Sequence, residues 1–155
     1  LLYDFSIKNP KILISGLNPH AGENGNIGKE ELNIISPAIT KLNKFKKLKI
    51  DGPVSGDSML IDKNRKIYNC FIFITHDQAL IPFKMISNFS GVNYTGNLDI
   101  IRVSPDHGTA YELVGGENIS SKSIENCFKL IKKINKNRRK NESTKKIFRT
   151  KFSYR

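Results

Sequence analysis

Three short runs of apolar residues predict three strands, and each run leads into a polar loop that carries a histidine. The runs span residues 11–15, 69–75 and 100–104, and the histidines that follow them are His20, His76 and His107. In open α/β sheets, ligands bind beyond the carboxyl ends of the strands, so the three loops would converge on one site if these strands are neighbours. The alternative is a structural role, because loops at strand ends are usually polar.

Apolar residues at spacings of three and four predict a helix after the first strand. This helix should begin near Lys29 and run to about residue 45, and Pro37 should kink it or start a second helix. The tripeptide Asp51-Gly52-Pro53 then predicts a turn, and the loop that continues from it carries Asp57.

Further helices are expected after the second and third strands. Short helices should occupy residues 78–88 and 109–114, and Ser120 or Ser121 is suited to cap a last helix. The apolar face of that last helix comprises Ile124, Cys127, Phe128, Ile131 and Ile134. The alternation of strands and helices indicates an α/β layer architecture.

The positive charge of the chain is concentrated near its end. The formal net charge is +12, and residues 132–155 hold 11 basic residues against one acid, Glu142, which leaves residues 1–131 close to neutral. Such a segment is most often solvated. We therefore expect residues 132–155 to be the end of the last helix followed by a basic, flexible tail. Binding of nucleic acid or an anionic surface through this tail is the alternative.

Cysteine usage and hydropathy indicate the compartment. Cys70 lies in an apolar run and Cys127 on an apolar helix face, which favours packing thiols in a reducing cytoplasm over a disulfide framework. No apolar stretch approaches the roughly 18 residues of a membrane-spanning helix, and nothing at the start resembles a signal peptide. A cytoplasmic protein without membrane contact is therefore expected.

Four polar motifs carry a resemblance to a known family. They are Gly16-Leu17-Asn18-Pro19-His20-Ala21-Gly22-Glu23, His76-Asp77-Gln78 followed by Lys84, Val92-Asn93, and Asp106-His107-Gly108-Thr109-Ala110. In this order and spacing they resemble the carboxyl-terminal half of 4-hydroxythreonine-4-phosphate dehydrogenases, which work in pyridoxal 5'-phosphate (vitamin B6) biosynthesis. The resemblance extends to about residue 131. Residues 1–131 are thus identified as the carboxyl-terminal half of such a dehydrogenase.

The resemblance implies a fold and an assembly. The fold would be the α/β fold of isocitrate and isopropylmalate dehydrogenases, with layers around a mixed sheet. Because the chain begins with Leu1 and the similarity starts midway through the family's length, we expect a fragment of a larger two-domain subunit. The resemblance also implies a homodimer whose site lies at the subunit interface.

The resemblance further implies a metal site. His20 and His76 would be ligands of a divalent ion, with zinc favoured and magnesium or cobalt as alternatives, and the third ligand would lie upstream of this chain. Each histidine has a carboxylate nearby in the sequence, Glu23 and Asp77, and a carboxylate partner makes imidazole a better ligand. Asp57 matches an acidic position near the metal, and Asp57 and Asp77 are the expected catalytic carboxylates. A simple turn aspartate is the alternative for Asp57.

Three further residues would hold the phosphorylated substrate. The resemblance assigns Lys84, Asn93 and Arg102 to this role, and a phosphate would supply the partners that an inward-facing arginine needs. The pattern alone favours an Arg102 that faces solvent on an edge strand. Residues 95–99 read Thr-Gly-Asn-Leu-Asp where relatives commonly have Thr-Leu-Gly-Leu-Pro, so the shape of this loop and the identity of the substrate stay open.

The loop after the third strand resembles the family's cofactor site. The residues expected against the adenosine end of NAD, or of NADP, are His107, Gly108, Thr109 and Ala110. Gly108 would allow close approach of the backbone, and Thr109 and the amides after it would offer donors. The absence of a Gly-x-Gly-x-x-Gly motif agrees with a dinucleotide site of another kind.

The implied activity is that of an oxidoreductase. It is the NAD-dependent and metal-dependent oxidation of 4-phosphohydroxy-L-threonine, followed by loss of carbon dioxide. The alternatives are a related dehydrogenase that acts on a phosphorylated four-carbon sugar acid, and a catalytically incomplete fragment.

Overall fold

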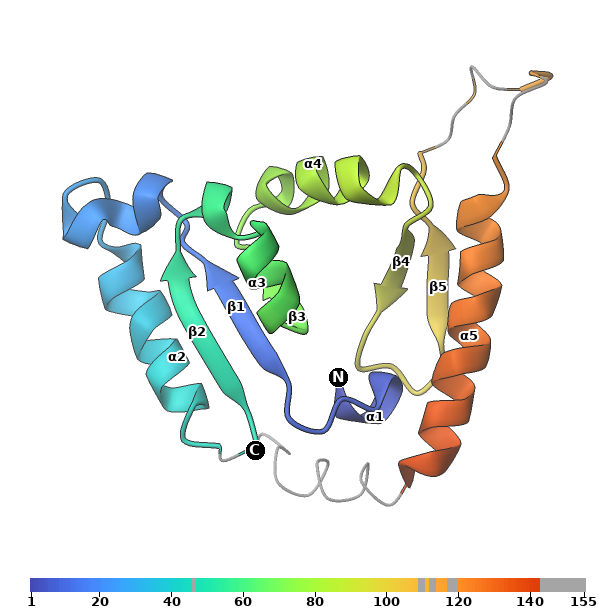
Figure 1. Cartoon of the computed structure of the whole chain (residues 1–155), viewed down its shortest axis with the longest axis horizontal. Helices are drawn as coiled ribbons and strands as arrows, with labels where there is room; N and C mark the ends of the chain where they lie inside the picture. The colour runs from blue at the N-terminus through green and yellow to red at the C-terminus, as the bar shows by residue number, and fades with distance from the viewer. Residues whose placement is uncertain (46, 109–110, 112–113, 117–119, 143–155) are drawn as a thin grey trace. The chain divides into compact units, whose positions relative to one another are not determined.

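The computed structural model describes residues 1–45, 47–108, 111, 114–116 and 120–142, and the chain divides into two compact units (Figure 1). One unit is Ile7–Pro82, which we call the sheet unit. The other joins Leu1–Ser6 to the described residues from Phe83 onward, and we call it the hairpin unit. The boundary between them falls within one helix, α4 (His76–Ser87).

The sheet unit is built around a central strand. Strand β1 (Lys11–Ser15) pairs in parallel with β2 (Lys49–Val54) on one side and β3 (Cys70–Ile72) on the other. Its apolar residues are buried on both faces of the sheet, as the central strand of a parallel sheet requires. The expected strand at residues 11–15 is confirmed, whereas the strand expected at 69–75 is shorter.

Short helices surround this sheet. They are η1 (Pro19–Gly25), the π-helical turn η2 (Glu31–Ile35), α2 (Ser36–Leu42), η3 (Gly56–Ser58), α3 (Asp62–Ile67) and the first turns of α4. Ile39 of α2 packs against Ile12, Ile14 and Ile50, and this cluster is the core of the unit. The expected effect of Pro37 is confirmed, because α2 starts at Ser36 with Pro37 in its first turn.

The turn expected at Asp51-Gly52-Pro53 is wrong, because β2 continues through these residues. Within the described sheet β2 is an edge strand, where the missing N–H of Pro53 is tolerated. Gly52 has a φ of +124°, and a Cβ there would lie 2.5 Å from the carbonyl oxygen of Ile14. Glycine therefore serves close approach of two strands here, and not a turn.

The hairpin unit contains α1 (Leu2–Phe5), the antiparallel strands β4 (Val92–Thr95) and β5 (Arg102–Pro105), and α5 (Lys122–Lys140). The parallel and antiparallel pairings thus occur in two separate sheets of the described residues, and not in one mixed sheet. An α/β fold with a parallel sheet is confirmed. The expected helix at residues 109–114 lies mostly outside the described residues.

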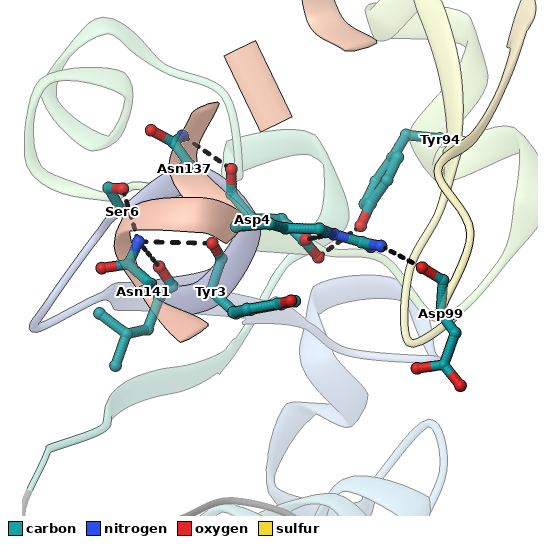
Figure 2. Close-up of polar contacts among 9 residues, drawn as sticks. Tyr3, Asp4, Ser6, Tyr94, Asp99, Asn137 and Asn141 are labelled. Carbon is teal, nitrogen blue, oxygen red and sulfur yellow. Dashed lines mark hydrogen bonds and ion pairs between the residues drawn. The ribbon is translucent and has the colours of Figure 1, made fainter. Parts of the chain in front are cut away.

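A buried ion pair joins the first and last helices of the hairpin unit (Figure 2). The guanidinium of Arg138 donates from Nε to Oδ1 of Asp4 at 2.5 Å and from Nη1 to the carbonyl oxygen of Asp99 at 2.7 Å. The hydroxyl of Tyr94 donates to Oδ2 of Asp4 at 2.5 Å. Asn137 adds a bond to the Asp4 carbonyl oxygen, so α5 holds α1 through side chains and backbone.

These contacts correct the expectation that the basic segment is solvated. Helix α5 continues to Lys140, and Arg138 is only 8% exposed. The amide of Asn141 donates to Oγ of Ser6 at 2.9 Å. The expectation of a solvated segment is therefore wrong for Arg138 and Asn141, whereas Lys132, Lys133, Lys136, Arg139 and Lys140 are exposed. Residues 143–155 lie outside the described part of the chain.

The two cysteines lie at packed positions, as their apolar surroundings in the sequence predict. Cys70 and Cys127 are free, with Cys127 buried and Cys70 partly buried, and burial raises the pKa of both thiols. Among the described residues, no helix combines the length and the apolar character needed to cross a bilayer.

The Asp4–Arg138 pair predicts a pH-dependent loss of stability in Asp4→Asn. Burial raises the pKa of Asp4, but the bonds from Arg138 and Tyr94 outweigh it and the pKa is lowered from 3.8. The pair's contribution is therefore fully present above pH 3.8 and is lost as the pH falls through the lower folded-state pKa. At pH 7, chemical denaturation should show a loss of about 3 kcal/mol, at the lower end for breaking a buried pair.

Asp62→Asn is the matched control for this measurement. Asp62 is 87% exposed and lies 3.6 Å from Arg65, so its loss should change the free energy of unfolding by less than about 0.5 kcal/mol. Equal effects of the two substitutions at pH 7, or a deficit of Asp4→Asn that disappears already at about pH 5, would contradict the role of the buried pair.

Candidate functional site

A pocket of about 530 Å³ lies in the sheet unit, where the loops after β1 and β2 meet the start of α4. Its lining residues are Leu17, Asn18, Pro19, His20, Ser55, Gly56, Asp57, Leu60, Asp77, Gln78, Ile81 and Pro82. The three parallel strands end at the edge of the sheet where these loops begin. This is the position at which ligands bind to open α/β sheets.

A side-chain network attaches α4 to the end of β1. Ser15 is fully buried, and its Oγ donates to Oε1 of Gln78 at 3.1 Å and accepts from the backbone N–H of Ile74 at 3.1 Å. Nε2 of Gln78 donates to the carbonyl oxygen of Gly16 at 3.2 Å. The first turn of α4 therefore has a defined position relative to the loop that carries His20.

His20 lies in a run of left-handed backbone. Residues 20–24 have φ angles of 52°, 52°, 80°, 44° and 56°, a conformation that costs about 1–2 kcal/mol for each residue other than glycine. Nδ1 of His20 is 2.6 Å from Oε1 of Glu23, and the imidazole is otherwise open, with 66% of the side chain exposed. The hydrogen bond to Glu23 raises the pKa of His20, and the charge of Asp57 raises it further.

The two expected catalytic carboxylates line the same pocket as His20. Oγ of Ser55 donates to Oδ1 of Asp57 at 2.5 Å, which lowers the pKa of Asp57 and keeps it ionised at neutral pH. Asp77 is exposed in the first turn of α4. His76 begins that helix and is exposed, but it is not a lining residue of the pocket.

The donors are not assembled into a complete metal site. Within the part of the chain that the structure describes, no group of three or more His, Cys, Asp or Glu side chains is placed to hold an ion. The assignment of His20 and His76 as ligands stays a prediction.

The three expected substrate residues lie in the hairpin unit. Nζ of Lys84 donates to the backbone oxygen of Asp106 at 2.8 Å and lies 3.3 Å from its Oδ1. Asn93 and Arg102 occupy the same face of the β4–β5 hairpin, because Asn93 pairs with Ser104 and Arg102 with Thr95.

The side chains of Asn93 and Arg102 are both exposed. Nη1 of Arg102 donates to Oγ1 of Thr95 at 2.8 Å, so the sequence-based alternative of a solvent-facing Arg102 agrees with the structure. The remaining guanidinium donors are still available to an anion.

His107 does not follow a neighbour of β1. The loops after β1 and β3 share a sheet, but β5 pairs with β4 in the other sheet, so the convergence of three histidine loops on one sheet edge is wrong for His107. His107 and Gly108 are exposed, and Nδ1 of His107 is 3.0 Å from the Gly108 oxygen. Thr109 and Ala110 lie outside the described residues.

Sequence reasoning missed Glu31, a buried carboxylate beside the pocket. Its Oε1 accepts from the backbone N–H groups of Leu17 and Asn18, both at 2.8 Å. The available signal was its spacing: Glu31 lies four residues before Ile35 and eight before Ile39, on the face that packs against the sheet.

This fold and pocket define an α/β protein with a site of mixed polar and apolar lining at the carboxyl edge of a parallel sheet. Residues 1–131 match the family described as Pyridoxal phosphate biosynthetic protein PdxA. The chain belongs to this family, which confirms the resemblance drawn from the motifs.

Two curated relatives illustrate the match. The chain is 49% identical over 112 residues to 4-hydroxythreonine-4-phosphate dehydrogenase of Zymomonas mobilis, covering 72% of this chain and 33% of that protein. It is 48% identical over 126 residues to the enzyme of the same name from Wigglesworthia glossinidia brevipalpis, covering 81% and 38%. The chain thus spans about a third of the length of the curated relatives it matches.

Solved structures agree with this placement. The crystal structure of 4-hydroxythreonine-4-phosphate dehydrogenase from Klebsiella pneumoniae superposes with a TM-score of 0.70 at 35% identity, covering 84% of this chain and 40% of that one. The enzyme of the same name from Burkholderia phymatum gives 0.65 at 35% identity, covering 86% and 40%.

The contact between His20 and Glu23 predicts a measurable pKa. Glu23→Gln removes the charge that raises the pKa of His20, so the pKa should fall toward 6.5, and Asp57→Asn should lower it by less. NMR titration of the histidine rings measures this directly. Asp62→Asn should leave the pKa of His20 unchanged. An unaltered pKa in Glu23→Gln would show that the contact with Glu23 does not determine the pKa of His20.

Proposed function

We propose that this chain contributes to the active site of a 4-hydroxythreonine-4-phosphate dehydrogenase. The reaction is NAD-dependent oxidation of the secondary hydroxyl of 4-phosphohydroxy-L-threonine and decarboxylation of the product, in pyridoxal 5'-phosphate biosynthesis. The observation that carries this proposal is the pocket of the sheet unit, where His20, Asp57 and Asp77 lie together in a chain of the PdxA family.

The donor chemistry of the pocket fits a divalent ion in part. Glu23 occupies Nδ1 of His20 and leaves Nε2 as a ligand, the arrangement that favours zinc, with cobalt or magnesium as alternatives. His20 and His76 would be two ligands of the ion, and the remaining ligands must come from elsewhere. When bound, the ion would lower the pKa of the substrate hydroxyl and stabilise charge as carbon dioxide leaves.

The carboxylates of the pocket have complementary roles. The hydrogen bond from Ser55 lowers the pKa of Asp57, so Asp57 keeps its negative charge near His20 and is suited to electrostatic support of the site. Asp77 lies in the first turn of α4, where the helix dipole favours its negative charge. We assign proton acceptance or electrostatic support of the site to these two side chains.

The hairpin unit supplies the proposed phosphate-binding groups. Lys84 and Arg102 carry the positive charges, and Asn93 offers an amide on the hairpin face that Arg102 shares. Bonds between these cations and phosphate oxygens are charge-assisted and are stronger than bonds between neutral groups.

The cofactor would contact the loop after β5. A Cβ at Gly108 would meet no atom within 4 Å, so packing within the described residues does not require glycine there. Close approach by a dinucleotide supplies a reason for it. NAD is the proposed cofactor, with NADP as the alternative, and a cytoplasmic homodimer is the proposed assembly.

A chimaera tests this function directly. The segment of the Zymomonas mobilis relative that matches this chain is replaced by the corresponding residues of this chain. With zinc and NAD, the chimaera should form NADH from 4-phosphohydroxy-L-threonine. A folded chimaera that is inactive, or one that prefers a phosphorylated four-carbon sugar acid, would contradict the proposal.

In the same chimaera, Arg102→Lys tests the phosphate site. The substitution keeps the charge but loses the planar fork, so kcat/KM for the substrate should fall by the equivalent of about 1–3 kcal/mol while KM for NAD stays the same. Arg65→Lys on the exposed surface of α3 is the control. Equal kinetics of both variants would support the alternative that Arg102 faces solvent and does not bind the phosphate.

A second candidate function rests on the outer face of α5. Seven basic residues of this helix are exposed, namely Lys122, Lys129, Lys132, Lys133, Lys136, Arg139 and Lys140. Helical spacing places them opposite the buried Cys127 and Ile134. Glu125 is the only acid of α5, so this face is suited to bind the phosphates of a nucleic acid such as RNA.

Substitution of three lysines tests this second candidate. Lys129, Lys133 and Lys136 changed together to Gln should weaken poly(U) binding and reduce the slope of log K against log salt by about 2, or roughly 0.7 for each phosphate that is no longer neutralised. Lys8, Lys63 and Lys66, which are exposed in the sheet unit, provide the matched triple control. An equal effect of both triples, or no binding at low salt, would exclude a specific role for α5.

A further inference from the structure

Glu31 is a buried acid whose carboxylate binds the loop that carries His20. It is 3% exposed. Its Oε1 accepts from the backbone N–H groups of Leu17 and Asn18 at 2.8 Å each, and its Oε2 accepts from Nδ2 of Asn18 at 2.9 Å. One side chain thus fixes the backbone that leads into the pocket.

The carboxylate depends on this loop for its own stability. Within the described residues, Glu31 has no ion-pair partner. Burial raises the pKa of Glu31, but the bonds from Asn18 and Leu17 outweigh it and the pKa is lowered. The charge is therefore stabilised by donors of the loop and by the backbone N–H of Glu31 itself, and a buried charge that lost the loop donors would be costly.

The loop is also shaped around the carboxylate. A Cβ at Gly16 would lie 2.9 Å from Oε1 of Glu31, and a Cβ at Gly22 would lie 2.6 Å from Oε2. Gly22 is itself within the left-handed run that contains His20. Two glycines on either side of Asn18 therefore leave room for this one carboxylate.

The place of the His20 ring depends on this backbone. Its one hydrogen-bond partner among the described residues is Glu23, which belongs to the same left-handed run. Contact with Glu23 cannot fix the ring relative to Asp57 and Asp77, because Glu23 moves with the loop. Glu31 belongs to η2, and Ile35 of η2 and Ile39 of α2 pack in the core of the sheet unit. The carboxylate of Glu31 therefore connects the loop to that core.

We propose that Glu31 is a positioning residue, which holds the loop of residues 16–25 so that His20 faces the pocket in the geometry that ion binding requires. The proposal deepens the function proposed above and rests on it for the role of the metal. The positioning itself is a property of the free chain and is measurable without an ion.

The experiment compares Glu31→Ala, Glu31→Gln and the wild-type full chain. Glu30→Gln is the matched control, since it removes an adjacent carboxylate that does not bond to the loop backbone. Three quantities are measured: hydrogen exchange of the Leu17 and Asn18 amides, the pKa of His20 by NMR, and the affinity for zinc by titration.

We expect Glu31→Ala to speed exchange at both amides by about tenfold, the effect of losing a charge-assisted hydrogen bond. The pKa of His20 should fall slightly, because a displaced loop carries the ring away from the negative charge of Asp57. Zinc affinity should fall about ten- to a hundredfold, the range for losing an outer support of a metal ligand. Glu31→Gln keeps one acceptor oxygen and should lie between wild type and Glu31→Ala.

The remaining outcomes separate this proposal from the proposed function. A lower melting temperature with an unchanged His20 pKa and unchanged zinc affinity would show a merely structural role and overturn the proposal. If Glu31→Ala does not fold, Glu31→Gln decides by the same criteria. If the wild-type chain binds no zinc but the His20 pKa shifts in the variants, positioning by Glu31 stands and zinc binding by this chain alone fails.

Discussion

Parallel pairing on both sides of β1 determines where the chemistry of the sheet unit lies. Because β2 and β3 both run parallel to β1, the loops that follow all three strands leave the same edge of the sheet. The buried apolar residues of β1 stabilise this arrangement, and Ser15 at its end bonds to Gln78 of α4. The position of the pocket is thus a consequence of strand direction, and its polar side chains need no contact with one another to be brought together.

The hairpin unit depends instead on a charged pair in a largely buried position. Arg138 and Asp4 are 134 residues apart, and their pairing lets a basic helix pack against an acidic first turn. An ion pair in this setting contributes through its geometry and its additional bonds to Tyr94 and Asp99, since desolvation opposes it. Of the basic residues of α5, Arg138 consequently has a structural role, whereas the other seven form an exposed basic face.

The sequence was sufficient for features with a local cause. The apolar run of β1, the helix start at Pro37 and the buried positions Cys127 and Ile134 follow from periodicity and proline geometry. It was insufficient where a residue remote in the sequence determines the local structure. Gly52 and Pro53 resemble a turn in the sequence, but in the structure they lie in a strand that pairs with β1. Arg138 resembled a solvated cation because Asp4 is remote in the chain. For the pocket, the family resemblance pointed to His20, Asp57 and Asp77, whereas the helical spacing that places Glu31 on the buried face was not used.

The division of the hairpin unit along the chain has a consequence for synthesis on the ribosome. Its first segment, Leu1–Ser6, is made before the entire sheet unit, and its last helix is made after it. The sheet unit is continuous, so all its strands have emerged well before α5 exists. Until α5 emerges, Asp4 lacks the guanidinium of Arg138, its ion-pair partner in the folded chain. The order of translation therefore favours a nascent chain in which the parallel sheet has formed but the hairpin unit is still incomplete, because its last helix has not been synthesised.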